Sequence, residues 1–328
     1  MDYDTLYMGL ALDKAWEYQF LTYPNPAVGA TVTHGGQIVA VEAHQKAGSS
    51  HAEVRALLAA YEQMSGDHIN FDYNDASKAH QFLLSLPPKF FKDCIIYVTL
   101  EPCSHYGKTP SCATLLSKLE LQEVIIGIAD PISGHDGGAT ILPRVRFGVL
   151  EQRCRELIEP FMIWQKRAFV LFKIAQTTNG RIGGGYLSSK DSLIHVHKIR
   201  AVCDRMVIGG NTVRVDRPTL DCRFIDSQAP DITIYSKGDD FDRDIPLFSI
   251  SGRDVEITDS LDFLGKPSLI LVEGGGGMIK AMQNHIDMLL LYQTDKLSVN
   301  RESYGIDRDL KLIHHSSNID DLTIWYRC

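Results

Sequence analysis

Long apolar runs are missing from this sequence. None approaches the ~18 residues that a membrane-spanning helix requires, so we expect no membrane role. Basic residues are in the minority, with 33 Lys and Arg against 41 Asp and Glu, which gives a formal net charge of −8. Because nonspecific affinity for nucleic acid depends on clustered Lys and Arg, this balance disfavours a nucleic-acid partner. A free small-molecule substrate therefore agrees better with the net charge than a polynucleotide does.

The number and placement of the cysteines do not indicate a disulfide framework. There are seven, an odd number, and they are scattered along the chain. The acidic start, Met1 to Asp4, has no basic region leading into an apolar stretch, as a signal peptide would. We therefore expect a protein of the reducing cytoplasm. With 328 residues, 44% of them hydrophobic, the chain is long enough for two globular domains.

One histidine, one glutamate and two cysteines carry the strongest chemical signal. His51 and Glu53 form a His-x-Glu pair, and further along the chain Pro102 precedes Cys103, with Cys112 following. One nitrogen and two sulfur ligands leave the fourth position of a zinc ion open, which is typical of catalytic zinc. Water in that position has its pKa lowered toward neutrality, and Glu53 would transfer the proton. Zinc-dependent nucleobase deaminases use this arrangement, with the glutamate as general acid and base.

The spacing of the cysteines points to a subfamily, because eight residues separate them where Pro-Cys-x-x-Cys is usual. Residues 102–112, PCSHYGKTPSC, resemble the deaminase half of the bifunctional riboflavin-biosynthesis deaminase/reductase family. Residues 23–29, YPNPAVG, and 44–48, HQKAG, match the same family in the same order. The resemblance further implies substrate contacts at Asn25 and Lys108. Taken singly, the histidine and cysteines would be interpreted as ordinary interior residues.

The first half of the chain shows alternating helical and strand patterns. Residues 62–92 are interpreted as a surface insertion, with a substrate-gating role as the alternative. We expect Cys103 to lie at the mouth of the helix that follows its strand. The predicted elements are a helix over 6–20, strands over 28–33 and 38–41 joined at Gly35–Gly36, a helix from Ala52 to Tyr61 and a strand over 94–100.

After a predicted connecting helix, a second series of alternating strand and helix patterns begins. Short apolar strands are expected at 169–174, 206–208, 232–235 and 268–272, which indicates an α/β sheet. We place a deaminase domain at 1–150, the connecting helix at 151–168 and a reductase domain at 169–328.

A second candidate site lies where the strand 269–273 runs into four glycines, 274–277. A turn without side chains lets backbone N–H groups approach phosphate, although a merely flexible turn is an equal alternative. The second half resembles the reductase half of the same family, which implies a dihydrofolate-reductase-like fold and NADPH. By position, the resemblance implies cofactor contacts at Ala175, Tyr186, Thr212, Asp216, Gly275, Gly276, Gly277, Met278, Ile279, Lys280 and Ala281. It implies substrate contacts at Arg200, Leu220, Arg223 and Glu273.

The reductase half departs from the family pattern at one loop. Residues 177–180 are TTNG where the family has Ser-Leu-Asp-Gly, so that an acidic side chain is replaced by Asn179. The loop over 182–186 is shorter, and 187–189 are LSS in place of Ile-Thr-Gly or Ile-Thr-Ser. Reductase activity is therefore less secure than deaminase activity.

The predicted fold class is α/β, a cytidine-deaminase-like α/β/α domain followed by a dihydrofolate-reductase-like α/β domain. The predicted function is zinc-dependent deamination of 2,5-diamino-6-(5-phosphoribosylamino)pyrimidin-4(3H)-one, followed by NADPH-dependent reduction of the ribose. The alternatives are a deaminase with an inactive reductase-like domain, a noncatalytic zinc scaffold and, disfavoured by the charge, a nucleic-acid-editing deaminase. We expect a homo-oligomer, whose number of subunits the sequence does not give.

Overall fold

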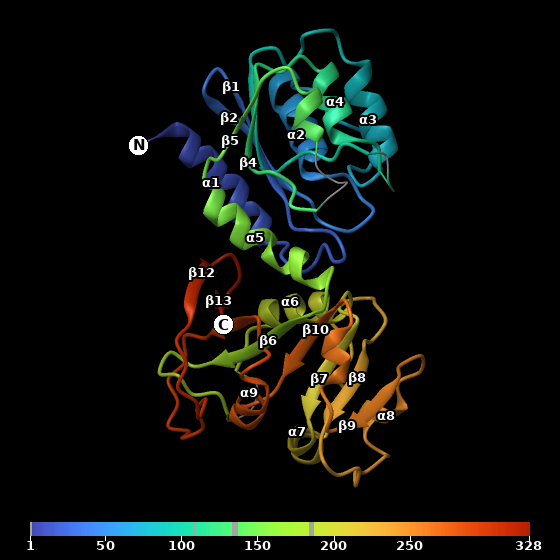
Figure 1. The fold of residues 1–328 in the computed structure, drawn as a ribbon, viewed down its shortest axis with the longest axis vertical. Coiled ribbons are helices and arrows are strands. Elements are labelled where there is room, and N and C mark those ends of the chain that lie inside the picture. The colour runs from blue at the N-terminus through green and yellow to red at the C-terminus, as the bar shows by residue number, and fades with distance from the viewer. Residues whose placement is uncertain (1, 106, 108, 133–136, 184–186) are drawn as a thin grey trace. The chain divides into compact units, whose positions relative to one another are not determined.

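The computed structural model describes residues 2–105, 107, 109–132, 137–183 and 187–328. It divides into two compact units, 1–162 and 163–328, each with its own sheet (Figure 1). Among the described residues, the helices are too short and too polar for any of them to cross a membrane. Two predicted site residues, Lys108 and Tyr186, lie outside the described residues.

The sheet of the N-terminal unit has the strand order β2-β1-β3-β4-β5. Strand β1 pairs antiparallel with β2 and β3, whereas β3, β4 and β5 are parallel. The predicted hairpin is confirmed, with Gly35 and Gly36 at φ 56° and 81° in its turn. The strands are β1 (Gly29–His34), β2 (Gln37–Ala43), β3 (Cys94–Leu100), β4 (Glu123–Ile128) and β5 (Val145–Phe147).

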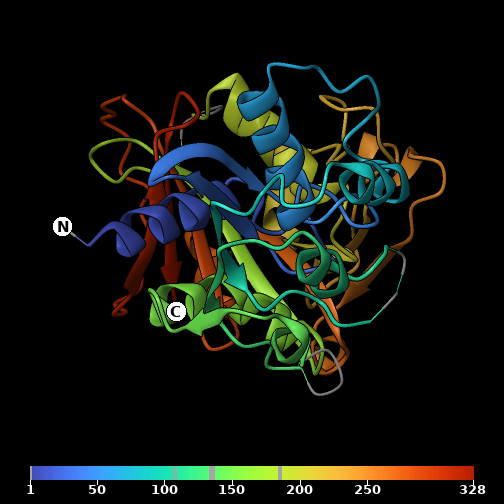
Figure 2. The same cartoon turned by 90° about the horizontal axis from the view of Figure 1, so that it is seen from above.

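Helices cover both faces of this sheet. Successive side chains of a strand point to opposite faces, and in β1 a Cβ at Gly29 would collide with the backbone of Ala11, whereas Ala30 packs in the core on the other side. Helices α2, α3 and α4 lie on that second face, and α1 lies on the first (Figures 1 and 2). The helices are α1 (Tyr3–Trp16), α2 (Ala52–Ser65), α3 (Ala76–Ser85), α4 (Cys112–Lys118), the 3₁₀ turn η1 (Gly138–Ile141) and α5 (Glu151–Trp164).

Two predicted segments pack against the core of the N-terminal unit. The segment interpreted as a surface insertion carries α3, whose Ala79 and Leu83 are fully buried in the core shared with α2 and β3. The helix predicted as a connector, α5, packs largely on the N-terminal unit. Cys154 lies against β4, where a side chain at Gly127 would collide with its sulfur, and the Gln19 amide donates a hydrogen bond to the Leu157 carbonyl (2.6 Å).

The sheet of the C-terminal unit has the strand order β12-β13-β11-β6-β10-β7-β8-β9, parallel from β11 to β9 and antiparallel at β12 and β13. Because β6, β10 and β7 run in parallel, their carboxyl ends meet at one edge. The strands are β6 (Ala168–Gln176), β7 (Arg205–Gly209), β8 (Asp231–Tyr235), β9 (Val255–Thr258), β10 (Ser268–Glu273), β11 (Met288–Gln293), β12 (Lys311–Ser316) and β13 (Leu322–Arg327).

The apolar strands of this sheet pack beneath short helices. Met278, Ile279 and Met282 of one such helix lie in the core with Val170, Val272 and Leu289 of the strands. The helices are α6 (Lys190–Arg200), α7 (Gly210–Asp216), α8 (Pro246–Ser249), the 3₁₀ turn η2 (Asp262–Gly265) and α9 (Gly276–Met282).

Candidate functional site

The predicted metal ligands come from two helix starts and one loop. His51 is the N-cap residue of α2, in extended backbone conformation (φ −70°, ψ 165°). Cys112 is the first residue of α4, directly after the N-cap Ser111. Cys103 lies in the loop that follows β3, and the backbone N–H of Cys112, the first residue of α4, donates to its sulfur (3.3 Å). The N–H of Ala113 donates to the Cys103 carbonyl (3.1 Å), so Cys103 lies at the N-terminus of α4, as expected, although the helix itself begins only at Cys112.

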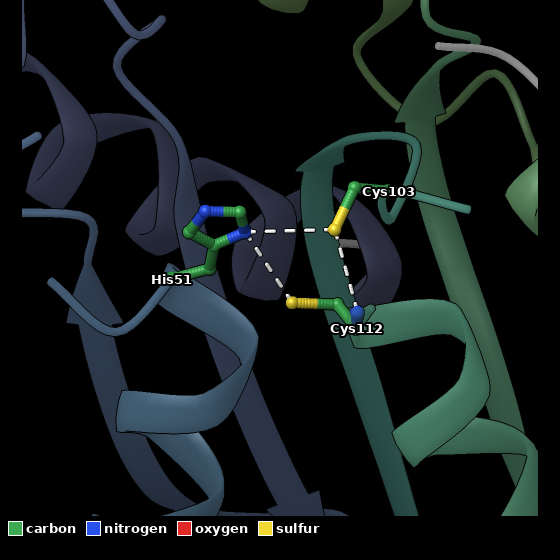
Figure 3. A group of neighbouring side chains, drawn as sticks. All are labelled: His51, Cys103 and Cys112. Carbon is green, nitrogen blue, oxygen red and sulfur yellow. Dashed lines mark hydrogen bonds between the residues drawn. The ribbon is translucent and has the colours of Figure 1, made fainter. Parts of the chain in front are cut away.

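The three side chains converge on a common point (Figure 3). The Nδ1 atom of His51 is 3.4 Å from the sulfur of Cys112 and 3.7 Å from that of Cys103, and the ligand atoms all lie within 4.8 Å of one another. With Zn–S bonds of about 2.3 Å and Zn–N bonds of about 2.0–2.1 Å, tetrahedral geometry separates ligand atoms by about 3.5–3.8 Å. The donor set and its spacing therefore fit a zinc ion held by three protein ligands.

The electrostatics of the cluster favour a thiolate. The hydrogen bond from Cys112, together with His51, lowers the pKa of Cys103 to about 4 despite its burial. The same hydrogen bond and burial raise the pKa of Cys112 well above its usual value. Burial lowers the pKa of His51, but its hydrogen bond to Cys103 and the charge of Glu53 outweigh burial and raise it. Binding of a divalent metal would displace the remaining protons, because metals bind thiolates and neutral imidazole.

Glu53 lies beside the cluster without belonging to it. It occupies the first turn of α2, it is only 3% exposed, and its carboxyl group is hydrogen-bonded to the thiol of Cys112. Burial raises the pKa of Glu53, which favours a carboxyl that holds a proton. A buried acid next to an open metal position is the geometry that proton transfer requires.

Two residues that orient His51 were missed by the sequence analysis. The hydroxyl of Thr109 is 3.2 Å from Nε2 of His51, on the opposite side of the ring from the cysteines. A partner on Nε2 fixes the ring so that Nδ1 faces the metal position. His44 packs edge-on against His51, with ring centroids 5.2 Å apart, and its Nε2 is 3.2 Å from the amide of the predicted substrate residue Asn25. His44 belongs to the matched HQKAG segment, which was the available signal.

The loop carrying Cys103 is anchored by Glu101, which was also missed. The buried carboxylate accepts hydrogen bonds from the backbone N–H groups of Asp130, Gly137 and Ala139, at 3.1, 3.0 and 2.9 Å. Gly138 lies so close to the Pro102 carbonyl that a Cβ there would collide with it. These contacts fix the chain immediately before Cys103, and they connect residues too far apart in sequence for any local pattern to show.

At the carboxyl edge of the second sheet, Glu273 lies between two cations. Lys173, its register partner on β6, is 3.0 Å from the carboxylate, and Arg200 from the end of α6 is 2.7 Å from it. Burial would raise the pKa of Glu273, but Arg200 and Lys173 lower it to about 2. The structure thus brings together two predicted substrate residues, Arg200 and Glu273, but as partners of each other.

The other predicted substrate residues of this unit lie next to that triad. Arg200 also donates to the backbone carbonyl of Asp221 (3.1 Å), whose side chain accepts from the half-exposed Arg223 (2.8 Å). Leu220 is buried and adopts φ 55°. The segment 220–223 therefore borders the triad, with the guanidinium of Arg223 at the surface.

The predicted cofactor residues divide into groups with different surroundings. Thr212 lies in the first turn of α7 and Asp216, exposed, is its last residue, while Ala175 lies near the end of β6. Gly275 is the N-cap of α9, which begins at Gly276 and continues through Gly277. Met278 and Ile279 are buried in the core, so only their backbone remains for a ligand, whereas Lys280 and Ala281 are exposed.

Residues 302–304 lie over the glycine turn. A Cβ on Gly276 would be 2.6 Å from the carbonyl oxygen of Ser303, and one on Gly275 would be 2.9 Å from the carboxylate of Glu302. Both distances are shorter than real Cβ contacts. The close approach of the chain's own backbone is thus one physical reason for glycine at 276, beside the predicted approach of a phosphate.

Comparisons with known proteins place the chain among zinc-binding deaminases and riboflavin biosynthesis proteins. The family model "Cytidine and deoxycytidylate deaminase zinc-binding region" matches residues 1–128. The riboflavin biosynthesis protein RibD of Aquifex aeolicus is 33% identical over 243 residues, 70% of this chain and 61% of that protein. RibD of Bacillus amyloliquefaciens is 30% identical over 287 residues, 79% of this chain and 69% of that protein. The aligned region thus spans less than two thirds of the Aquifex relative.

Solved structures show the same fold over the whole chain. A diaminohydroxyphosphoribosylaminopyrimidine deaminase/5-amino-6-(5-phosphoribosylamino)uracil reductase from Thermotoga maritima gives a TM-score of 0.66 at 24% identity, covering 99% of this chain and 98% of that one. RibD of Acinetobacter baumannii, form 1, gives a TM-score of 0.65 at 22% identity, with the same coverage. This likeness confirms the predicted fold class.

Proposed function

The chain belongs to the RibD family of riboflavin biosynthesis proteins, and we propose that it deaminates 2,5-diamino-6-(5-phosphoribosylamino)pyrimidin-4(3H)-one and then reduces the ribose of the product. The observation that carries the first step is the convergence of His51, Cys103 and Cys112 beside the buried Glu53. This arrangement leaves a coordination position open, which disfavours the scaffold alternative.

The deaminase residues have distinct proposed roles. His51 Nδ1 and the two cysteine sulfurs would hold zinc, which supplies Lewis-acid activation of water at neutral pH. Glu53 would transfer two protons in turn, the first from the attacking water to a ring nitrogen and the second from the resulting hydroxyl group to the departing amino group. Its raised pKa lets it hold a proton between the two transfers. Asn25 and Lys108 are proposed to contact the substrate, and Asn25 is connected to the cluster through His44.

The second step is proposed for the carboxyl edge of the C-terminal sheet. NADPH would supply the hydride, and the glycine turn before α9 offers backbone N–H groups to its phosphates. Arg223, whose guanidinium is half exposed, is proposed to contact the substrate phosphate. Arg200 and Glu273 shape the same edge through their ion pair with each other.

A second candidate function is a deaminase whose reductase-like unit is inactive. One observation favours it, namely that residues 302–304 pack closely against Gly275 and Gly276. The two candidates differ in a direct measurement: titration of the full-length protein with NADPH, followed by NADPH oxidation in the presence of the deaminated intermediate.

The deaminase proposal is tested by Glu53→Gln in the zinc-loaded protein. Because Glu53 transfers protons and binds no metal, ammonia release should fall by at least ~100-fold while the zinc content stays unchanged. Glu120→Gln, at an exposed position, serves as the control and should retain activity. Loss of zinc from the Glu53 variant would place that residue in the ligand shell and contradict the proposed mechanism.

Location and assembly complete the proposal. We propose a cytoplasmic enzyme that assembles as a homo-oligomer. All seven cysteines are free thiols in the structure, which supports a reducing compartment. Light scattering of the purified protein would measure the number of subunits.

A further inference from the structure

A pocket of about 420 Å³ lies between α3 and α4, beside the metal cluster. Helix α3 contributes Ser77, His80 and Leu84 to its lining, and the opposite wall includes Ser104 and Ser111. Its volume falls within the range of about 300–1,000 Å³ that is typical of small-molecule sites.

The pocket adjoins both cysteine ligands. Ser104 directly follows Cys103, and Ser111 directly precedes Cys112. The pocket therefore lies next to the chain segments that carry two of the proposed metal ligands.

The lining of the pocket combines apolar surface with uncharged polar groups. Among the described residues, Leu84, Pro110 and Leu115 supply apolar surface, hydroxyl, amide and imidazole side chains supply hydrogen-bonding groups, and no carboxylate, lysine or arginine is present. Such a lining suits neutral groups that both donate and accept hydrogen bonds, as sugar hydroxyls do.

His80 is the most unusual residue of the lining. It is only 6% exposed, and it makes no hydrogen bond to any residue that the structure describes. Burial, followed by the effect of His51, lowers the pKa of His80 to about 4, so its ring is neutral at physiological pH and offers one donor and one acceptor. Because the described residues supply no hydrogen-bond partner and His80 lines the pocket, its ring nitrogens are available to a ligand there.

Helix α3 holds His80 rigidly toward the pocket. Ala79 and Leu83 on the same helix are fully buried in the core, and Asp75 caps the helix by accepting from the N–H of Lys78 (3.0 Å). The segment first interpreted as a surface insertion therefore builds one wall of a pocket next to the reacting centre.

We propose that this pocket receives the ribosyl part of the pyrimidine ribosyl phosphate and that His80 forms a hydrogen bond with a sugar hydroxyl. The proposal rests on the proposed deaminase function. It assigns to α3 a role in recognising the sugar, separate from the chemistry at the ring.

Binding to the zinc-loaded full-length protein tests the proposal, with calorimetry of two compounds. One is the ribosyl phosphate substrate, and the other is the corresponding base without the sugar, 2,5,6-triaminopyrimidin-4(3H)-one. For His80→Ala we expect the Kd of the ribosyl compound to rise roughly five- to tenfold, about the effect of one hydrogen bond, with the Kd of the base unchanged. His80→Gln should recover part of the affinity, because an amide also donates and accepts.

Two further variants keep the test decisive if His80→Ala does not fold. Leu84 is 45% exposed at the pocket, so Leu84→Trp fills the space without disturbing the core and should weaken the ribosyl compound selectively. Lys78→Ala, on the exposed side of the same helix, is the matched control and should change neither affinity.

The outcomes separate this proposal from the proposed function. If the His80 and Leu84 variants bind both compounds as the unmodified protein does, or lose affinity for both equally, the sugar pocket is wrong. If the unmodified protein binds the ribosyl compound in a His80-dependent way but releases no ammonia, the pocket stands and the deaminase function fails. If it binds neither compound, both proposals fail.

Discussion

The triad of Glu273, Lys173 and Arg200 allows a quantitative prediction. All three side chains are nearly buried, with 11–13% of their surface exposed. The two cations lower the pKa of Glu273 from 4.5 to about 2, and each unit corresponds to about 1.4 kcal/mol, so the carboxylate contributes about 3 kcal/mol to stability at neutral pH. Glu273→Gln removes this charge and leaves two nearly buried cations without their carboxylate, although Arg200 keeps its hydrogen bond to the Asp221 carbonyl. We expect a loss of about 3 kcal/mol in the free energy of unfolding.

The pH dependence has a definite sign. The pKa of Glu273 is lower in the folded protein, so its contribution is fully present above the ordinary value of 4.5 and disappears as the pH falls toward about 2. Urea unfolding of the full-length protein at a series of pH values measures this. The difference between the unmodified protein and Glu273→Gln should be largest at pH 7 and should narrow once the pH falls below 4.5.

An exposed ion pair of the same unit provides the control. Glu256 pairs with Arg205 at 2.7 Å, but half of its side chain is exposed, so Glu256→Gln should cost less than about 1 kcal/mol. A loss below 1 kcal/mol for Glu273→Gln, or a difference that does not change with pH, would show that the cations do not stabilise the carboxylate as described.

Three further predictions concern the two sites. Cys103→Ser should lose bound zinc and ammonia release together, which metal analysis and a deaminase assay would measure, while NADPH-dependent reduction persists. Full zinc occupancy in this variant would exclude Cys103 as a ligand. Gly276→Val places a branched side chain against the Ser303 carbonyl, so NADPH affinity measured by fluorescence should fall while deamination continues, and an unchanged affinity would argue against a cofactor at this turn. Arg223→Ala should raise the KM of reduction roughly tenfold, which is the effect of losing one charged hydrogen bond. Thermal stability should change little, because the side chain is half exposed. An unchanged KM would show that Arg223 does not contact the substrate.

Local patterns predicted the elements that position the metal site. The strand over 94–100 and the start of a helix at Ala52 agree with the structure. Both have a local signal, because a continuous apolar run favours a buried strand and apolar residues at helical spacing favour a helix with one buried face. The ligand triad followed from residue types at a characteristic spacing, and the structure brings those side chains together. The length of the loop between Cys103 and the start of α4 at Cys112 has no local signal in the sequence.

Contacts between distant segments were beyond sequence reasoning. Glu101 and Gly138 fix the cysteine loop through backbone N–H groups and close packing, and neither leaves a periodic trace in the sequence. The role of His80 was hidden for a similar reason. Its helix has the apolar spacing of a surface element, and only the tertiary structure shows that Ala79 and Leu83 anchor it to the core beside the metal loop.

The departure at Asn179 is explained by the same tertiary contacts that cover the glycine turn. Its amide oxygen accepts from Thr177 (2.8 Å) and from the N–H of Ser298 (3.1 Å), and its amide nitrogen donates to the Ser298 carbonyl (2.8 Å). A carboxylate in its place accepts but cannot donate, so asparagine is the better residue for this connection. A few residues further on, the N–H of Ile182 donates to the Glu302 carbonyl (3.3 Å). The altered loop and the segment over Gly275 are therefore connected by a backbone hydrogen bond.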